Sequence, residues 1–280
     1  MIQSRFFNKT TNPKDLPLII LGNGPSASTT LENPHFKREN YQLMTVNLFA
    51  SQPIFNQVKP EFYVFLDKAF FDFDLEALEN PTLAPAVKSN SKFLGTQKLI
   101  NQTWNNLLSS DWGITLFVPQ LFRNSTIVQK LKEKNFRIQF FNYTVVKGFE
   151  SYENWIYRTG LGSPQSQNVI NTCIFQAINY QFQEIYLLGV ESNFHSNLVV
   201  NGENQLMMRD DHFYEVETKW IPLIHPENRS VRMHEFYTNL TKAFYSHFRL
   251  SQYANYRNQK IYNATENSFI DAYQRKKLPL

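Results

Sequence analysis

Three polar positions in the sequence each follow directly on a short apolar run. They are the segment Gly22-Asn23-Gly24-Pro25-Ser26, then Asn47 and Asp67. Glycines at a strand end let the backbone turn tightly and approach a ligand, and an asparagine amide can both donate to and accept from a base or ribose edge. Each position alone also fits an ordinary turn. Together they predict a site for a polar small molecule, although not for a dinucleotide, because Pro25 interrupts the G-x-G-x-x-G pattern.

A second candidate site is the start of an amphipathic helix that follows Ser166, Gln167 and Asn168. The free N–H groups and the positive end of the dipole at a helix start suit a phosphate or a carboxylate. Ser166 or Asn168 is equally suited to cap this helix. The two roles are compatible, so the helix start joins the predicted binding residues.

Two histidines are candidates for a general base. His212 lies in Asp210-Asp211-His212-Phe213-Tyr214, and His225 lies in Ile224-His225-Pro226. A histidine with a pKa near neutrality can take the proton from a hydroxyl group that attacks an electrophilic carbon. Either one also fits a solvated loop residue, and the choice between them stays open.

One acidic pattern could hold a metal ion. Asp72-Phe73-Asp74 imitates the D-x-D motif that binds a divalent metal on a diphosphate in many sugar-transferring enzymes. It lies within a stretch with a helical pattern, residues 68–78. We therefore expect neither a metal site nor a cofactor.

The elements that must position these residues are read from the alternation of short apolar runs with helical patterns. This alternation predicts an α/β fold, a single Rossmann-like domain over residues 1–280, with a mostly parallel sheet and helices on both faces. The carboxyl ends of parallel strands share one edge, so Asn23, Asn47 and Asp67 should meet on a common rim that the 166–168 helix start faces. The predicted strands are residues 16–21, 41–46, 62–66, 114–118, 137–141, 184–188 and, as the last, 261–262.

Two helices and one long loop complete the prediction. Apolar residues from Ile170 to Ile178 fall on one helical face, so Cys173 is expected to be a buried apolar residue and not a nucleophile. Phe236, Leu240, Phe244 and Phe248 recur every fourth residue along a later helix, in which His247 is expected at the surface or the edge of the core. Residues 192–232 are polar without a clear period, which predicts a flexible lid.

The composition excludes several classes of function. The formal net charge of +4 is mild and spread along the chain, so no nucleic-acid partner is expected. The run Arg275-Lys276-Lys277 is interpreted as a solvated tail, with a contact to anionic lipid or glycan left open. One cysteine and the lack of a membrane-spanning apolar stretch favour the cytoplasm, with peripheral contact at the inner membrane and self-association left open.

The chain also resembles a known family in three places. The first is Gly22-Asn23-Gly24-Pro25-Ser26, the second is residues 183–191 with Gly189 and Glu191, and the third is residues 261–268. These segments resemble the bacterial sialyltransferases of glycosyltransferase family 42, of the Campylobacter lipooligosaccharide type. They also resemble the related domain of unknown function in polysaccharide and flagellin-glycosylation proteins.

This resemblance implies an inverting, metal-independent transferase that moves a nonulosonic sugar from a CMP-activated donor to a cell-surface glycan or glycolipid. By this resemblance, Asn23, Asn47 and Asp67 contact the cytidine and ribose, with Asp67 standing where the family usually has Asn. Ser166 and Asn168 lie beside the phosphate or the carboxylate. The family's base is a histidine after the lid, which corresponds to His212 or His225, and Tyr214 substitutes for the tyrosines that hold the departing phosphate.

Two other interpretations remain open at this point. One is a different enzyme of the same wider group, such as a transferase for Kdo or another sugar, or a pyrophosphokinase-like enzyme. The latter would need magnesium, because diphosphate chemistry normally requires a metal. The other is a non-catalytic module that binds a nucleotide or glycan and hydrolyses no donor.

Overall fold

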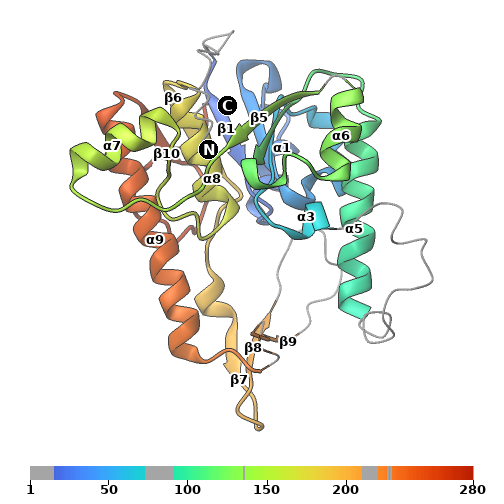
Figure 1. Ribbon diagram of the computed structural model, residues 1–280, viewed down its shortest axis with the longest axis vertical. Helices are drawn as coiled ribbons and strands as arrows, with labels where there is room; N and C mark the ends of the chain where they lie inside the picture. The colour runs from blue at the N-terminus through green and yellow to red at the C-terminus, as the bar shows by residue number, and fades with distance from the viewer. Residues whose placement is uncertain are drawn as a thin grey trace.

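The computed structural model describes residues 16–72, 91–134, 136–209, 220–225, 227 and 229–279, and only the backbone of residues 91–96. Its centre is an eight-stranded sheet with the order β11-β10-β6-β1-β2-β3-β4-β5 (Figure 1). Every pairing recorded among these strands is parallel. The strands are β1 (Leu18–Leu21), β2 (Gln42–Val46), β3 (Phe62–Val64), β4 (Thr115–Pro119), β5 (Arg137–Phe141), β6 (Glu184–Leu188), β10 (Lys260–Asn263) and β11 (Gln274–Arg275).

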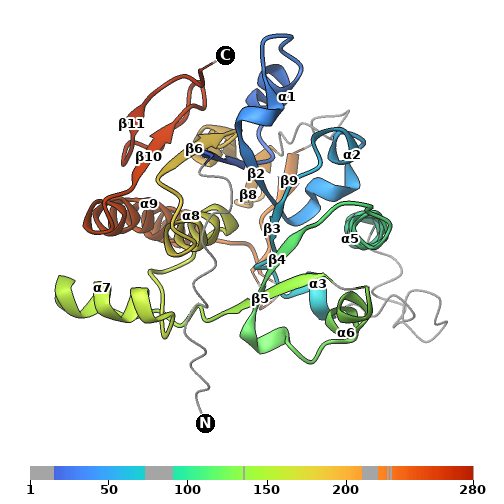
Figure 2. The same ribbon diagram turned by 90° about the horizontal axis from the view of Figure 1, so that it is seen from above.

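Helices cover both faces of the sheet, which confirms the predicted α/β, Rossmann-like fold (Figure 2). One face carries α7 (Glu150–Thr159), α8 (Val169–Asn179) and α9 (Met233–Tyr256). The other carries α1 (Ser26–Leu31), α2 (Ile54–Val58), α3 (Ala69–Asp72), α5 (Ser91–Leu108) and α6 (Thr126–Glu133). Short 3-10 helices are η1 (Arg38–Asn40), η2 (Asn47–Ser51), η3 (Gln120–Phe122) and η4 (Phe194–Asn197).

The sequence of strand β1 shows why the sheet is buried between the two layers of helices. All four of its residues are apolar and fully buried. Leu18 and Ile20 pack in the core beneath α8, whereas Ile19 and Leu21 pack in the core on the opposite face. A strand buried on both sides has no polar face, so it has the continuous apolar sequence typical of parallel sheets.

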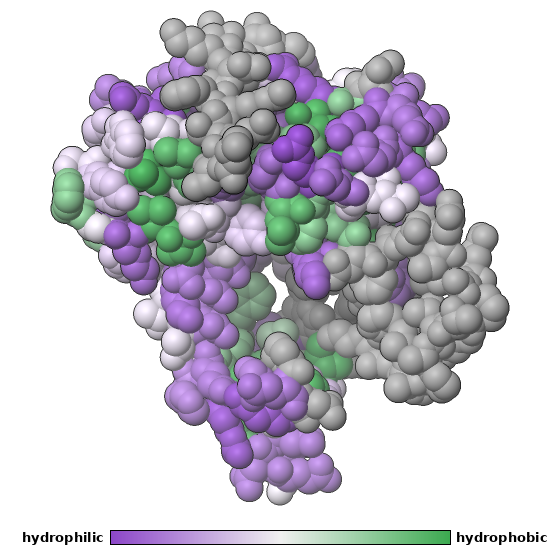
Figure 3. Space-filling model, in the orientation of Figure 1, coloured by the Kyte–Doolittle hydropathy of each residue, from purple (hydrophilic) through white to green (hydrophobic). Residues whose placement is uncertain are grey.

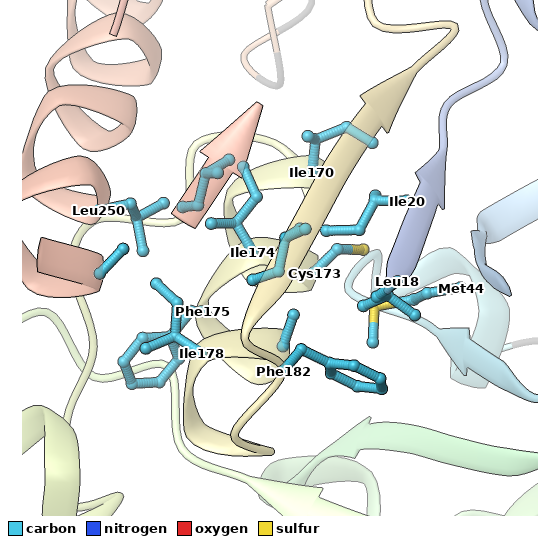
Figure 4. Close-up of a cluster of buried hydrophobic side chains, with 14 of the residues drawn as sticks. Leu18, Ile20, Met44, Ile170, Cys173, Ile174, Phe175, Ile178, Phe182 and Leu250 are labelled. Carbon is cyan, nitrogen blue, oxygen red and sulfur yellow. The ribbon is translucent and has the colours of Figure 1, made fainter. Parts of the chain in front are cut away.

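Helix α8 fills the first of these two cores. Its residue Cys173 is fully buried against the sheet, beside Leu18 and Ile20 (Figure 4). Burial raises the pKa of the Cys173 thiol well above its ordinary value, which keeps it protonated. The prediction that Cys173 is an apolar core residue is confirmed.

The prediction for residues 192–232 needs one correction. The described part of this segment is not irregular, because η4 is followed by a three-stranded antiparallel sheet of β7 (Leu198–Val200), β8 (Leu206–Arg209) and β9 (Trp220–Pro222). Strands this short are too brief to show an alternation in the sequence. Figure 1 shows this outer sheet below the main body, joined to it by α9. That the segment acts as a lid stays a prediction.

Helix α9 departs from the prediction at His247. His247 is buried, with 1% of its surface exposed, whereas Phe248 is 50% exposed. The reason is geometric: with 3.6 residues per turn, a stripe of every fourth residue drifts by about 40° per step. After three steps from Phe236 it has left the buried face, and Phe248 points outward while its neighbour His247 faces the core.

The basic run near residue 275 is largely exposed, as predicted, but it belongs to an ordered strand and is not a loose tail. Arg275 lies in β11, which follows β10, so residues 261–262 do not form the last strand. The Arg275 guanidinium donates to the backbone carbonyls of Thr265 and Ser268. The Lys276 ammonium lies 4.2 Å from the ring centre of Tyr262. Arg275 and Lys277 are both exposed, whereas Lys276 is half-buried.

Candidate functional site

The order of the strands creates a crevice between β1 and β6. After β1 the chain continues to β2 on one side, and after β6 it continues toward β10 on the other side. In an open parallel sheet, such a reversal of strand order leaves a crevice outside the carboxyl ends of the strands, where ligands bind. The segment Gly22–Ser26 follows β1, and Gly189 follows β6. Both therefore lie at this reversal.

A cavity of about 610 Å³ occupies this position, within the size range of small-molecule sites. The space-filling view shows the surface hollowed between the main body and the largely hydrophilic outer part (Figure 3). The structure brings most of the predicted binding residues together at this cavity. Those that line it are Gly22, Asn23, Gly24, Asn47, Asp67, Gln167, Asn168, Gly189 and Glu191.

Two asparagines present buried acceptors at the cavity. The side-chain Oδ1 atoms of Asn23 and Asn47 are shielded from solvent, and neither has a hydrogen-bond partner among the described residues. A buried acceptor without a donor costs about 1–3 kcal/mol. If the amides turn toward the cavity, the hydroxyl or amino donors of a ligand such as a nucleoside would remove this cost.

Asn47 is held in an unusual backbone conformation. Its φ is +44°, in the left-handed region that asparagine tolerates better than most residues. The Tyr63 hydroxyl donates to the Asn47 carbonyl at 2.5 Å and accepts from the Ala50 N–H at 2.8 Å. Burial raises the pKa of Tyr63, which keeps this hydroxyl protonated. The core therefore fixes the direction in which the Asn47 side chain leaves the sheet.

Asp67 has a local structural role as well as its place at the cavity. Its Oδ1 accepts a hydrogen bond from the Ala69 N–H at 2.9 Å, at the start of α3. This is the ordinary turn function that an Asp at a strand end supplies. Residue 67 is exposed, so the carboxylate is in contact with solvent at the rim of the cavity.

The backbone amides of the glycine segment form hydrogen bonds within the protein. The N–H groups of Gly22 and Gly24 donate to the carbonyls of Leu188 and Gly189 at 2.8 and 2.9 Å. The Ser26 N–H donates to the Glu191 carboxylate at 2.9 Å. These donors are used to join the end of β1 to the end of β6, and Ser26 does not line the cavity among the described residues.

The need for glycine here comes from this close approach. A Cβ atom at Gly24 would lie 1.5 Å from Glu191 Oε2. Gly189 has a φ of +69°, and a Cβ there would meet the Ala27 side chain at 2.7 Å. The glycine-rich sequence thus reflects the packing of two protein segments, in addition to the shape of the cavity.

The start of α8 forms another wall of the cavity. Asn168 caps the helix, because its Oδ1 accepts from the Asn171 N–H at 2.9 Å. Gln167 and Asn168 line the cavity, whereas Ser166 is not among the described lining residues. Asn168 therefore both caps α8 and lines the cavity, as the sequence suggested.

The outer wall contains residues that sequence reasoning missed. Phe194 and Asn197 of η4, and Met208 and Arg209 of β8, line the cavity opposite the strand ends. The Arg209 Nη2 lies 3.5 Å from Asn197 Oδ1. The only signal in the sequence was an arginine within the predicted lid, and nothing there indicates that this position returns to the sheet edge.

Of the three candidate catalytic residues, the structure describes only His225. His212 and Tyr214 lie outside the described residues. His225 lies in a turn closed by a bridge between Ile224 and Ser230, and it is not among the described residues that line the cavity. Its Nδ1 accepts a hydrogen bond from the Glu227 N–H at 3.2 Å.

The described residues were compared with the requirements of a metal site and of a membrane-spanning helix. Within the described ranges, no group of three or more His, Cys, Asp or Glu residues could hold a metal ion. Asp72 ends α3, and Asp74 lies outside the description. None of the helices in the described ranges combines the length and the apolar character needed to cross a bilayer.

The comparisons with known proteins yield one structural likeness. No family model matches the sequence, and no curated protein matches it significantly. Among solved structures, the chain is similar to the MAf glycosyltransferase from Magnetospirillum magneticum AMB-1, with 14% identity and a TM-score of 0.46. The alignment covers 94% of this chain and 33% of that protein, so the chain spans about a third of its length. A likeness at this level bears on neither substrate nor reaction.

Proposed function

We propose that the cavity binds a nucleotide-activated sugar and that the protein is a glycosyltransferase. The observation that supports this most is the meeting of Asn23, Asn47 and Asp67 with the start of α8 around one cavity at the strand reversal. The unpartnered Oδ1 atoms of Asn23 and Asn47 favour a ligand with donor groups, as in a base and a ribose. The positive end of α8, at a separate wall of the cavity, favours an anionic group of the ligand.

The proposed donor is a nonulosonic sugar acid linked to CMP, and the proposed acceptor is a glycan or glycolipid. The support for this finer assignment is the sequence resemblance at residues 22–26, 183–191 and 261–268. The three segments lie at the ends of β1, β6 and β10, which are adjacent in the sheet. The resemblance is therefore concentrated around the reversal at which the cavity lies.

The proposed reaction is a direct displacement with inversion. The acceptor hydroxyl oxygen forms a bond to the anomeric carbon, while the bond between that carbon and the CMP phosphate oxygen breaks and its electron pair stays on the phosphate. The acceptor proton passes to a histidine, His212 or His225. A positioned general base contributes about 10²–10⁴-fold to the rate. Tyr214 is proposed to donate to the departing phosphate.

Nucleotide binding provides the first test. The shift in melting temperature is measured with CMP, UDP, GDP and ATP, with and without magnesium. Stabilisation by cytidine nucleotides alone supports the proposal, and stabilisation by purine nucleotides alone refutes it. An Asn23→Ala, Asn47→Ala double variant should lose the stabilisation by CMP. Arg137→Ala is the matched control, because Arg137 is exposed at the start of β5 and is not a described lining residue.

Donor turnover separates an enzyme from a binding module. An enzyme of the proposed kind should hydrolyse a CMP-linked sugar acid slowly without an acceptor, and release of CMP is followed by chromatography. Replacement of His212 or His225 by Ala should lower turnover about 10²–10⁴-fold and leave CMP affinity nearly unchanged. If neither replacement lowers turnover, the assignment of the base is wrong. Binding of CMP with no hydrolysis or transfer of any donor would instead identify a non-catalytic module.

A further inference from the structure

The charged residues described around the cavity are divided between two walls. Asp67 and Glu191 lie on the wall formed by the strand ends, whereas Arg209 lies on the wall formed by β8 of the outer sheet. Of these three side chains, only the Arg209 guanidinium carries the charge that attracts an anionic ligand. Charges in direct contact with a ligand at a partly enclosed wall interact strongly enough to orient it.

The glycine segment cannot supply the positive site. A glycine-rich turn after the first strand often binds phosphate through its backbone N–H groups. Here the N–H groups of Gly22 and Gly24 are used by carbonyls at the end of β6. The Ser26 N–H already binds an anion of the protein itself, the Glu191 carboxylate. A ligand phosphate at this turn would have to displace that carboxylate and lie beside its charge.

Arg209 has the position and the chemistry that the turn lacks. Its guanidinium contacts Asn197, which also lines the cavity, and this contact places the charged group at the cavity wall. A guanidinium has five N–H donors in a fixed planar arrangement, so it can keep a protein contact and still bind an oxyanion through two parallel hydrogen bonds.

We propose that Arg209 is the residue of the outer sheet that binds the anionic group of the ligand, a phosphate or a carboxylate. Asp67, Asn23 and Asn47 then face the uncharged, hydroxyl-bearing part. In this arrangement the ligand bridges the parallel sheet and the outer sheet. The identity of the ligand as a CMP-linked sugar acid rests on the proposed function, whereas the assignment of the oxyanion to Arg209 rests on the cavity.

The test measures dissociation constants by calorimetry for the wild type, Arg209→Ala and Arg209→Lys, with Arg137→Ala as the control. The probes are cytidine, CMP, a CMP-linked sugar acid and the methyl ester of that donor. Loss of a charge-assisted pair should weaken binding about 10- to 100-fold. Arg209→Lys should recover only part of this, because lysine keeps the charge without the paired geometry. The melting temperature without ligand checks that each variant folds.

The two sources of the oxyanion give different results. If Arg209 binds the phosphate, Arg209→Ala weakens CMP and leaves cytidine unchanged. If it binds the sugar carboxylate, Arg209→Ala weakens the donor acid and leaves both CMP and the methyl ester unchanged. The proposal is overturned if Arg209→Ala binds every probe as the wild type does. It is also overturned if cytidine weakens as much as CMP, or if Arg137→Ala has the same effect.

A nucleoside-free probe keeps this inference separate from the proposed function. If the wild type binds no cytidine compound, the proposed function fails, and pyrophosphate then tests Arg209 alone. Stabilisation of the wild type by pyrophosphate that disappears in Arg209→Ala supports an oxyanion site in a protein of different specificity. No stabilisation of the wild type, or equal stabilisation of the wild type and Arg209→Ala, overturns the inference.

Discussion

The stability of the fold should depend on pH through His247. This residue of α9 is fully enclosed, its Nδ1 lies 3.1 Å from the Tyr273 hydroxyl, and its Nε2 has no hydrogen-bond partner among the described residues. Burial lowers the pKa of His247 from 6.5 to about 3. Protonation in the folded state would therefore place an uncompensated charge in the interior.

The direction of the effect follows from the two pKa values. The unfolded chain takes up the proton near pH 6.5, and the folded chain only near pH 3, so the unfolded state binds more protons between these values. The free energy of unfolding should be constant above about pH 6.5 and fall by about 1.4 kcal/mol per pH unit below it. Between about pH 7.5 and pH 5 the His247 contribution should fall by about 2 kcal/mol.

Urea unfolding followed by tryptophan fluorescence at these two pH values measures this loss. His247→Asn removes the titrating group and retains an amide that can bond the Tyr273 hydroxyl, so its unfolding free energy should fall by about 2 kcal/mol less than that of the wild type over the same interval. His234→Asn is the control, because His234 is an exposed residue of the same helix. Equal losses in the wild type and His247→Asn would refute the reasoning.

Three further substitutions test side-chain contacts described by the structure, the first two by urea unfolding and the third by the dissociation constant for CMP. Glu153→Ala should cost about 3–5 kcal/mol, because it leaves the Arg249 guanidinium buried without its carboxylate; a loss below about 1 kcal/mol would contradict this. Asn168→Ala should cost about 1 kcal/mol through the lost cap of α8, whereas Asn168→Asp should retain most of the stability. Gly24→Ala should reduce CMP binding, because its Cβ would displace Glu191, and unchanged affinity would show that the contact is not rigid.

The parallel sheet could be predicted from the sequence because most residues of its long strands are apolar, as in LIIL of β1 and EIYLL of β6. Strands β5 and β6 have the predicted bounds, and β1 to β4 lie within two residues of theirs. The outer sheet could not be predicted, because strands of three or four residues do not display an alternation. The two-residue β11 was missed for the same reason.

The candidate site was predictable where topology alone determines position. Asn23, Asn47 and Asp67 meet because parallel strands end at one edge. Arg209 was missed, because its place at the cavity depends on the return of the outer sheet, a long-range contact with no local signature. The glycine segment was recognised correctly as a special turn, but the sequence could not reveal that β6, and not a ligand, accepts its hydrogen bonds. Which histidine acts as the base stays a prediction.

The hydrogen bonds between the ends of β1 and β6 have a consequence for how the chain folds. Ser26 and Glu191 are 165 positions apart, so the floor of the cavity joins an early and a late part of the polypeptide. Closing so long a loop is slow, because the chain loses conformational entropy before the contact contributes any stabilising free energy. A half-made chain can form the strands from β1 to β5, yet it has no complete cavity. The cavity is therefore complete only once β6, η4 and β8 have joined the strands that precede them in the chain.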